Sequence, residues 1–284
     1  MTKAKATIHG AISLVNAIAT QKGATVGIAL KVEAIAEVSP GKGIAIQSEN
    51  KSLSSRLINR TIEKIVSKKD LEKNKITITL DSEIPTGYGL KSSSAISSAV
   101  AMACSKIFKP KLTDQQILLA GVDASIETKV SITGAYDNAC SCYYGGFNIT
   151  DNSKRKRIHF EKAPSNLVAI IFIPKNRKRG NLKNLKTLGS IFNTSWELAR
   201  KGNYWEAMTI NGLATTAILN SQSDIITALI EKGAIGASMS GNGPSIAAVV
   251  KKDNVTSVKK VFSSLEGNII VSKINNEKAE VHEL

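Results

Sequence analysis

The sequence predicts an α+β protein made of one large domain or of two closely packed ones. Apolar and polar residues alternate at 26–32 and at 75–80, which is the pattern of half-buried strands. Apolar residues follow a helical period at 52–68, and residues 181–232 are mainly helical in character. A chain of 284 residues is long for one compact unit, so a second α+β layer is expected after the first.

The first half of the chain alternates between strands and helices. Its expected elements are strands at 26–32 and 44–47, a helix at 52–68, a strand at 75–80, and helices at 95–108 and 113–129. A glycine turn at 41–43 joins the first two strands. Thr113 and Gln116 have the spacing of a capping box, which places the start of the last helix. Residues 9–20 show no clear period, so no element is predicted there.

The second half is expected to form the further α+β layer. Its elements are strands at 147–150 and 167–173, helices within 181–232 that break at Gly202 and Asn203, a strand, glycine loop and strand over 234–250, a helix at 254–265 and a strand at 269–274. The basic turn at 154–157 is the candidate boundary between domains of residues 1–155 and 156–284. The polar residues after Asn275 are interpreted as a tail.

Composition is that of an ordinary soluble protein, with 42% hydrophobic and 21% charged residues. The longest strongly apolar run, 167–173, is far too short to span a bilayer, and the N-terminus does not resemble a signal peptide. We therefore expect a cytoplasmic protein with no membrane partner. Cys104, Cys140 and Cys142 are interpreted as reduced structural thiols, and three dispersed histidines suggest no transition-metal site.

The net charge of +15 has two interpretations, a nucleic-acid partner or a basic surface around a site for small anions. Basic residues are spread along the chain and aromatic residues make up only 5%, which leaves few platforms for base stacking. The second interpretation is favoured, and no nucleic-acid partner is expected, although charge alone does not exclude RNA.

The stretch PTGYGLKSSSA, residues 85–95, lies between an expected strand and an expected helix and has the composition of an anion-binding loop. We call it the phosphate loop. Glycines let backbone N–H groups turn toward a phosphate, the following helix contributes its positive end, and serine hydroxyls can bind Mg²⁺. It is not a Walker loop, because Leu90 rather than glycine precedes Lys91, nor a dinucleotide loop, because Ser92 replaces the third glycine. Taken alone, a loop of this composition would more often be a plain Gly/Ser turn between a strand and a helix.

Three motifs in order resemble the signatures of the GHMP kinase superfamily, which includes galactokinase, homoserine kinase and mevalonate kinase. The phosphate loop resembles the second signature, TGAYDNAC at 133–140 the segment of the catalytic aspartate, and GASMSGNGPSI at 236–246 the third signature. GLKSSSA, TGAYDNACSCYYGG and the N-terminal GAISLVNAIATQKGATVGI look most like the archaeal-type shikimate kinases, which phosphorylate shikimate with ATP to give shikimate 3-phosphate for aromatic amino-acid biosynthesis.

The resemblance implies a two-domain fold, with an N-terminal domain like ribosomal protein S5 and a ferredoxin-like C-terminal domain. It implies ATP and Mg²⁺ as cofactors, Asp137 as the catalytic residue that deprotonates or orients the acceptor hydroxyl, and Ser93 and Glu127 as metal ligands. The nucleotide-binding residues it implies are Pro85, Thr86, Gly87, Tyr88, Gly89, Leu90, Lys91, Ser92, Ser93, Ser94 and Ala95.

Residues for the acceptor or the phosphates are more weakly indicated. By resemblance, Asn16 lies in a region that lines the acceptor site, and Ser240, Gly241 and Gly243 form a second loop near the phosphates. Arg177 and Arg179 are candidates to bind the acceptor carboxylate, since guanidinium groups suit carboxylates, although a solvated basic loop explains them as well.

The sequence leaves other functions open. Homoserine kinase, or another small-molecule kinase of the same superfamily, is the first alternative, and a basic RNA-binding module without kinase activity is the second. The N-terminal region lacks the P-G-[KR]-[VI] signature that mevalonate kinases and galactokinases carry, which counts against their two substrates. The sequence is also compatible with a homodimer.

Overall fold

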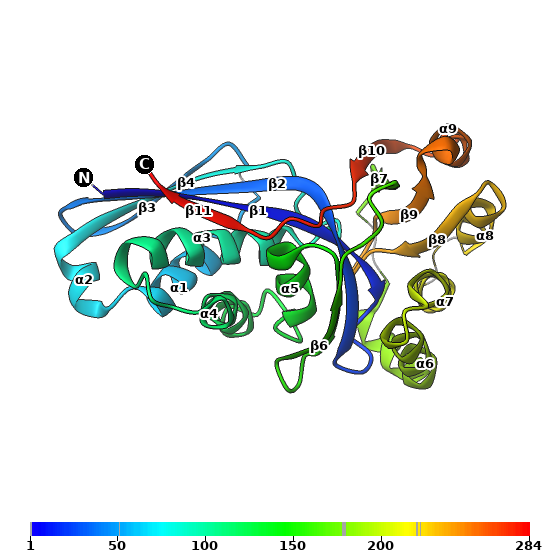
Figure 1. Cartoon of the computed structure of the whole chain (residues 1–284), viewed down its shortest axis with the longest axis horizontal. Helices are drawn as coiled ribbons and strands as arrows, with labels where there is room; N and C mark the ends of the chain where they lie inside the picture. The colour runs from blue at the N-terminus through cyan, green and yellow to red at the C-terminus, as the bar shows by residue number, and fades with distance from the viewer. Residues whose placement is uncertain (1, 51, 178–179, 220, 222) are drawn as a thin grey trace.

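The computed structural model describes residues 2–50, 52–177, 180–219, 221 and 223–284. Two sheets lie at opposite ends of an elongated molecule, each covered by its own helices (Figure 1). The α+β architecture expected from the sequence is confirmed. Both chain termini lie at the far end of the first sheet, side by side (Figure 1).

The first sheet is built around two long antiparallel strands that pair along most of their length. The strands are β1 (Thr2–Val15), β2 (Lys22–Pro40), β3 (Gly43–Ser48), β4 (Asn74–Ser82), β5 (Phe147–Asp151), β6 (Lys156–Glu161) and β11 (Glu280–Glu283). Their order is β11-β1-β2-β4-β3, with β5 pairing to the other part of β2 and β6 to β5. Strand β1 was not predicted because its second half is buried on both faces, which removes the alternation a half-buried strand shows.

One face of this sheet is covered by helices (Figure 1). They are α1 (Ser55–Ile65), α2 (Lys68–Lys73), α3 (Ser92–Phe108), α4 (Asp114–Glu127) and α5 (Tyr136–Tyr144). The capping box predicted at Thr113 and Gln116 opens α4. The helix expected at 52–68 is α1, which ends at Ile65. A second, short helix that was not predicted follows it, because the Ser67 side chain accepts a hydrogen bond from the Asp70 N–H and starts α2.

The second sheet is antiparallel in the order β10-β7-β9-β8, which is the arrangement of a ferredoxin-like βαββαβ fold. Its strands are β7 (Leu167–Pro174), β8 (Ala234–Met239), β9 (Ile246–Lys251) and β10 (Gly267–Lys273). The chain between them forms α6 (Gly189–Arg200), α7 (Tyr204–Ile218), α8 (Asp224–Glu231) and α9 (Val255–Lys259), with 3-10 turns η1 (Leu182–Leu188), η2 (Lys252–Asn254) and η3 (Lys260–Phe262).

The two faces of strand β7 join separate parts of the hydrophobic core. Ile170 and Phe172 pack with side chains from α8 and the segment around α9, while Ala169 and Ile171 belong to the main core that extends into the first sheet. A strand buried on both faces explains the continuous apolar run in the sequence. The main core therefore links the two halves of the molecule.

One expectation about chain organisation is wrong, and the structure gives the position of another. The residues after Asn275 are not a free tail, because β11 pairs with β1 at the edge of the first sheet. The expected domain boundary after residue 155 falls in the turn between β5 and β6, two strands of one sheet. The division into domains at that point remains a prediction.

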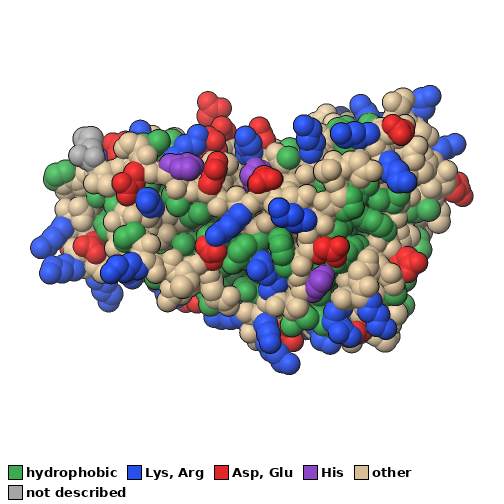
Figure 2. Space-filling view, in the orientation of Figure 1, with side chains coloured by type: hydrophobic (Ala, Val, Ile, Leu, Met, Phe, Trp, Pro, Cys, Tyr) green, Lys and Arg blue, Asp and Glu red, His purple; other side chains and the backbone are tan. Residues whose placement is uncertain are grey.

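The surface is basic without a single concentrated basic patch on the face that Figure 2 shows, where lysines and arginines are spread and acidic groups lie between them. Within the described residues, no helix combines the length and the apolar character needed to cross a membrane. Cys104, Cys140 and Cys142 are all free and buried, as expected for reduced structural thiols.

Candidate active site

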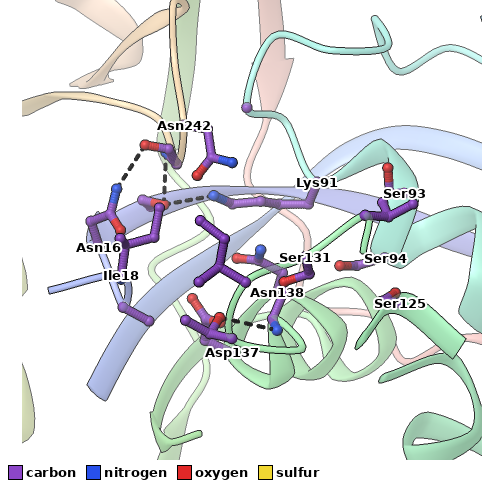
Figure 3. A pocket seen from close by; sticks show the side chains of 18 of the residues that line it. Asn16, Ile18, Lys91, Ser93, Ser94, Ser125, Ser131, Asp137, Asn138 and Asn242 are labelled. Atoms are coloured by element: carbon purple, nitrogen blue, oxygen red, sulfur yellow. Dashed lines mark hydrogen bonds between the residues drawn. The ribbon is translucent and has the colours of Figure 1, made fainter. Parts of the chain in front are cut away.

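A cleft lies where the phosphate loop, the end of β1, the loop after β8 and the segment before α5 meet (Figure 3). The two glycine-rich motifs and the aspartate motif, far apart in the sequence, all contribute to it. Its lining residues are Ser13, Asn16, Ala17, Ile18, Gly87, Gly89, Lys91, Ser92, Ser93, Ser94, Ser125, Val130, Ser131, Ile132, Thr133, Ala135, Asp137, Asn138, Gly241 and Asn242.

The phosphate loop has the backbone conformation of an anion site. Gly87 and Gly89 have φ values of +87° and +81°, and α3 begins immediately after Lys91 without a side-chain cap. An uncapped helix N-terminus directs N–H groups and the positive end of the helix dipole toward the cleft. A side chain at Gly89 is excluded, because its Cβ would lie 1.9 Å from the Ser240 carbonyl oxygen.

Six of the eleven predicted nucleotide-binding residues line the cleft, and five do not. Gly87, Gly89, Lys91, Ser92, Ser93 and Ser94 line it, whereas Pro85, Thr86, Tyr88, Leu90 and Ala95 are not among its lining residues. Leu90 and Ala95 are fully buried in the core, and their positions anchor the loop and the helix. The role of the whole set in nucleotide binding remains a prediction.

The third motif braces the phosphate loop from the other half of the molecule. The Ser240 hydroxyl donates to the Gly89 carbonyl oxygen at 3.0 Å, and the Ser245 hydroxyl donates to the Tyr88 carbonyl oxygen at 2.6 Å. Gly241 lines the cleft, but Gly243 does not. The predicted Ser240 therefore acts on the loop backbone, while Gly241 reaches the cleft itself.

Asp137 lies in the first turn of α5 and is 3% exposed. Its Oδ1 accepts a hydrogen bond from Asn152 Nδ2 at 2.8 Å, and its backbone N–H donates to Asn152 Oδ1 at 3.1 Å. Burial raises the pKa of the Asp137 carboxyl above its ordinary value, while Lys91 and Asn152 act in the opposite direction. A buried carboxylate held by one amide and facing a cleft is suited to accept a proton.

Lys91 extends from the phosphate loop across the cleft toward Gly241, above Asp137 (Figure 3). Its Nζ donates to the Ser13 hydroxyl at 2.6 Å, and Ser13 also accepts from the Gly241 N–H at 3.0 Å. Burial lowers the pKa of Lys91 to about 8, although the Asp137 carboxylate favours its charged form. Sequence analysis did not single out Ser13, although Ser13 lies within the N-terminal stretch that resembles the archaeal-type kinases, because that stretch shows no clear period.

Asn16 lines the cleft, as predicted, but both ends of its side-chain amide have protein partners. Its Nδ2 donates to the Gly241 carbonyl oxygen at 2.8 Å, and its Oδ1 accepts from the Ile18 N–H at 2.9 Å. Asn16 thus ties the end of β1 to the third motif. Contact with an acceptor molecule remains a prediction for this residue.

Glu127 lies outside the cleft, although it was assigned as a metal ligand together with Ser93. Its carboxylate is paired with Arg60 and Lys64, and hydrogen bonds from these two groups hold the pKa of Glu127 below its ordinary value. Ser93 does line the cleft. The described residues contain no group of three or more histidine, cysteine, aspartate or glutamate side chains able to hold a metal ion.

The cleft nevertheless has a donor set that suits Mg²⁺. Ser93, Ser125 and Asp137 present hydroxyl and carboxylate oxygens, which are the hard donors that Mg²⁺ prefers. Mg²⁺ commonly uses one or two carboxylates and completes its shell with water and substrate phosphates, so a cluster of acidic residues is not required.

Of the two arginines predicted to bind an acceptor carboxylate, Arg177 is not among the residues that line the cleft. Arg177 is exposed and lies over the Tyr88 ring, 4.7 Å from its centroid. Arg179 lies outside the described residues. The role of both in acceptor binding remains a prediction.

Several polar residues of the cleft were missed by sequence reasoning. Asn138 directly follows Asp137, and its Oδ1 is buried with no hydrogen-bond partner among the described residues. Thr133 is the first residue of the aspartate motif, which also contains Asn138. Ser131 lies just before that motif, and Asn242 belongs to the third motif (Figure 3). Membership of a recognised motif, or for Ser131 proximity to one, was the available signal.

Comparisons with known proteins agree with this arrangement. The family model described as the GHMP kinases N terminal domain matches residues 56–146, and the one described as GHMP kinases C terminal matches residues 182–265. Proteins named shikimate kinase align over nearly the whole chain. The one from Methanosarcina mazei is 38% identical, covering 95% of this chain and 94% of that protein. The one from Methanobrevibacter smithii is 34% identical, covering 94% and 95%.

Solved structures with the same fold include kinases for other acceptors. Homoserine kinase from Cytophaga hutchinsonii superposes with a TM-score of 0.78 at 19% identity, covering 99% of this chain and 97% of that one. L. major mevalonate kinase, solved in complex with R-mevalonate, gives 0.74 at 16% identity, with 96% of each chain covered. Identities this low establish the fold alone.

Proposed function

Since this chain belongs to the GHMP kinase family, we propose that it transfers the γ-phosphoryl group of ATP to a hydroxyl of shikimate, giving shikimate 3-phosphate. The observation that carries the proposal is the buried Asp137 carboxylate facing the serine-rich phosphate loop across one cleft. Several relatives at 30–38% identity over nearly their whole length bear the name shikimate kinase, which supports the choice of acceptor.

In this proposal the phosphate loop and the start of α3 bind the phosphates of ATP. Gly87 and Gly89 line the cleft with left-handed backbone conformations, and the serines at the helix start add hydroxyl donors. Ser240 and Ser245 hold the loop rigid through its carbonyl groups, so little reorganisation is required when the nucleotide binds.

Asp137 acts on the acceptor. The acceptor oxygen attacks the γ-phosphorus, the bond from that phosphorus to the β–γ bridging oxygen breaks, and ADP leaves with the electron pair. The proton of the hydroxyl passes to the Asp137 carboxylate, whose raised pKa makes it a better proton acceptor than an exposed carboxylate. Asn152 keeps the carboxylate oriented throughout.

Mg²⁺, when bound with ATP, neutralises charge on the phosphate oxygens. Ser93 and Ser125 would hold it from the cleft. Glu127 would join them only after leaving Arg60 and Lys64, so we propose it as a ligand that the ion recruits.

The experiment that tests the function is ADP release from ATP with Mg²⁺ and one acceptor at a time, comparing shikimate, homoserine and mevalonate. Turnover with shikimate alone, lost in Asp137→Ala, supports both substrate and site. Turnover with homoserine instead would replace the proposed acceptor and keep the site. No turnover with any acceptor, together with salt-sensitive RNA binding, would reject the kinase proposal.

The three free and buried cysteines support the further proposal that the protein works in the reducing cytoplasm. A homodimer remains a prediction, which sedimentation analysis of the purified protein at micromolar concentration would test.

A further inference from the structure

Lys91 occupies a backbone position that favours glycine. Its φ is +67°, in the left-handed region, and it immediately precedes α3 as the helix N-cap, where it makes no side-chain capping hydrogen bond. An L side chain is disfavoured in this conformation, and burial of its ammonium group adds a second unfavourable contribution. Two local costs at one residue are typical of a position held for function.

The surroundings of Lys91 are shaped to admit its ammonium group. Gly241 also has a positive φ, of 56°, and a Cβ at that position would lie 2.5 Å from Lys91 Nζ. The Lys91 ammonium therefore lies against Gly241, where a side chain would take up the space that the ammonium occupies. Only one hydrogen bond from Nζ, to Ser13, occurs among the described residues, although an ammonium has three donors.

Among the described residues that line the cleft, Lys91 is the only one with a basic side chain. The charged side chains of this described lining are the Lys91 ammonium and the Asp137 carboxylate, and their interaction favours the charged form of each. Arg177, one of the two arginines predicted for the site, is exposed, contacts the Tyr88 ring and does not line the cleft. Of the described side chains that line the cleft, Lys91 is therefore the cation available to negative charge that develops there.

We propose that Lys91 is a catalytic residue whose ammonium group binds the oxygens of the phosphoryl group during transfer, between the phosphate loop and the Asp137 carboxylate. The ammonium takes no proton in this step, since it acts as a fixed positive charge and hydrogen-bond donor. Ser13 holds it in place before the nucleotide arrives. The proposal rests on the kinase function but not on the identity of the acceptor.

The test replaces Lys91 by methionine, which keeps the length of the side chain and removes its charge. The matched control is Lys129→Met, because Lys129 also has a positive φ, of 58°, but is exposed and does not line the cleft. We expect Lys91→Met to lower kcat by about 10²–10³-fold, the usual loss for one such donor. Lys129→Met is expected to leave kcat unchanged.

A binding measurement separates this role from a structural one without requiring turnover. Dissociation constants are measured for Mg²⁺ and ADP alone, and for the same mixture with aluminium fluoride, which imitates the phosphoryl group in transfer. We expect Lys91→Met to weaken the second complex at least tenfold more than the first. Equal weakening of both, or kcat within threefold of the unchanged protein, would overturn the proposal.

The outcomes also distinguish a failure of the Lys91 proposal from a failure of the proposed substrate. If the unchanged protein phosphorylates a different acceptor, shikimate fails as the substrate, and the same Lys91 comparison made with that acceptor still decides the present proposal. If shikimate is phosphorylated and Lys91→Met binds both ADP complexes as the unchanged protein does, only the role of Lys91 is rejected.

Discussion

The backbone of Gly23 on β2 lies directly against the Asp137 carboxylate, so that a Cβ on Gly23 would come within 2.7 Å of Oδ2. The carboxylate cannot yield easily, because Asn152 hydrogen-bonds both its Oδ1 and the backbone N–H of Asp137. The position of the proposed proton acceptor therefore depends on the absence of a side chain in the neighbouring strand.

Gly23→Ala should displace the carboxylate and lower kcat by about tenfold to a hundredfold, because small misplacements of a reacting group are costly. Steady-state kinetics with shikimate would measure the change. Gly189→Ala is the control, since the nearest atom to its Cβ is 3.9 Å away. Equal activity of both variants would show that Asp137 tolerates displacement.

Asp137→Asn distinguishes a general base from an orienting group. A base is expected to contribute about 10²–10⁴-fold to turnover, and the asparagine variant would lose that factor. Because burial raises the pKa of Asp137, activity of the unchanged protein should fall with decreasing pH at a higher pH than an exposed carboxylate would give. A profile of kcat/KM against pH would show this limb, and its persistence in Asp137→Asn would assign it to another group.

The buried Lys91 should make stability depend on pH in the alkaline range. Its pKa is lowered to about 8 in the folded protein, from 10.5 in the unfolded chain. Between these values the unfolded state binds more protons, so the stability of the unchanged protein should rise with pH relative to Lys91→Met. Urea denaturation of both proteins at pH 7, 8.5 and 10 would measure the difference, and parallel curves would contradict it.

Ser245→Ala removes the hydroxyl that braces the Tyr88 carbonyl group. The loss of a buried hydrogen bond should cost about 1–3 kcal/mol of unfolding free energy, and the loosened loop should raise the KM for ATP. Ser263→Ala is the control, because that hydroxyl bonds only within its own turn, to Lys260. An unchanged KM for ATP in Ser245→Ala would show that the loop does not need this support.

Glu127→Gln tests whether Mg²⁺ recruits Glu127 from its ion pairs. The variant should require a higher Mg²⁺ concentration for half-maximal activity, because one carboxylate ligand is lost. Glu63→Gln is the matched control, since Glu63 also pairs with Arg60 but belongs to α1. The same Mg²⁺ dependence in both variants would remove Glu127 from the metal site.

Local sequence patterns predicted elements whose signals are local. The capping box at Thr113 and the alternation in β4 each depend on neighbouring residues, and the structure has both elements. Strand β1 was not predicted, because burial on both faces of its second half removes the alternation of apolar and polar residues. Strand β11 was not predicted either, because its short polar sequence forms a strand only by pairing with β1.

The candidate site divides in the same way. The motifs identified the phosphate loop, Asp137 and Gly241, since each is written in a short stretch of sequence, and the structure brings all three to one cleft. The partnership of Ser13 with Lys91 joins residues 78 positions apart, and that of Asn16 with Gly241 joins residues 225 apart. Contacts of this kind are set by the packing of the two sheets, which no local pattern encodes.

The pairing of β11 with β1 has a consequence for folding of the chain. Ala4 is paired with Glu283, so this contact joins two segments that have nearly the whole described chain between them. Until β11 reaches β1 during folding, the outer edge of β1 has no partner, and an unpaired strand edge is a site for association with other chains. Contacts between segments so far apart in sequence form slowly, so β11 completes the first sheet late and then covers an edge that would otherwise invite aggregation.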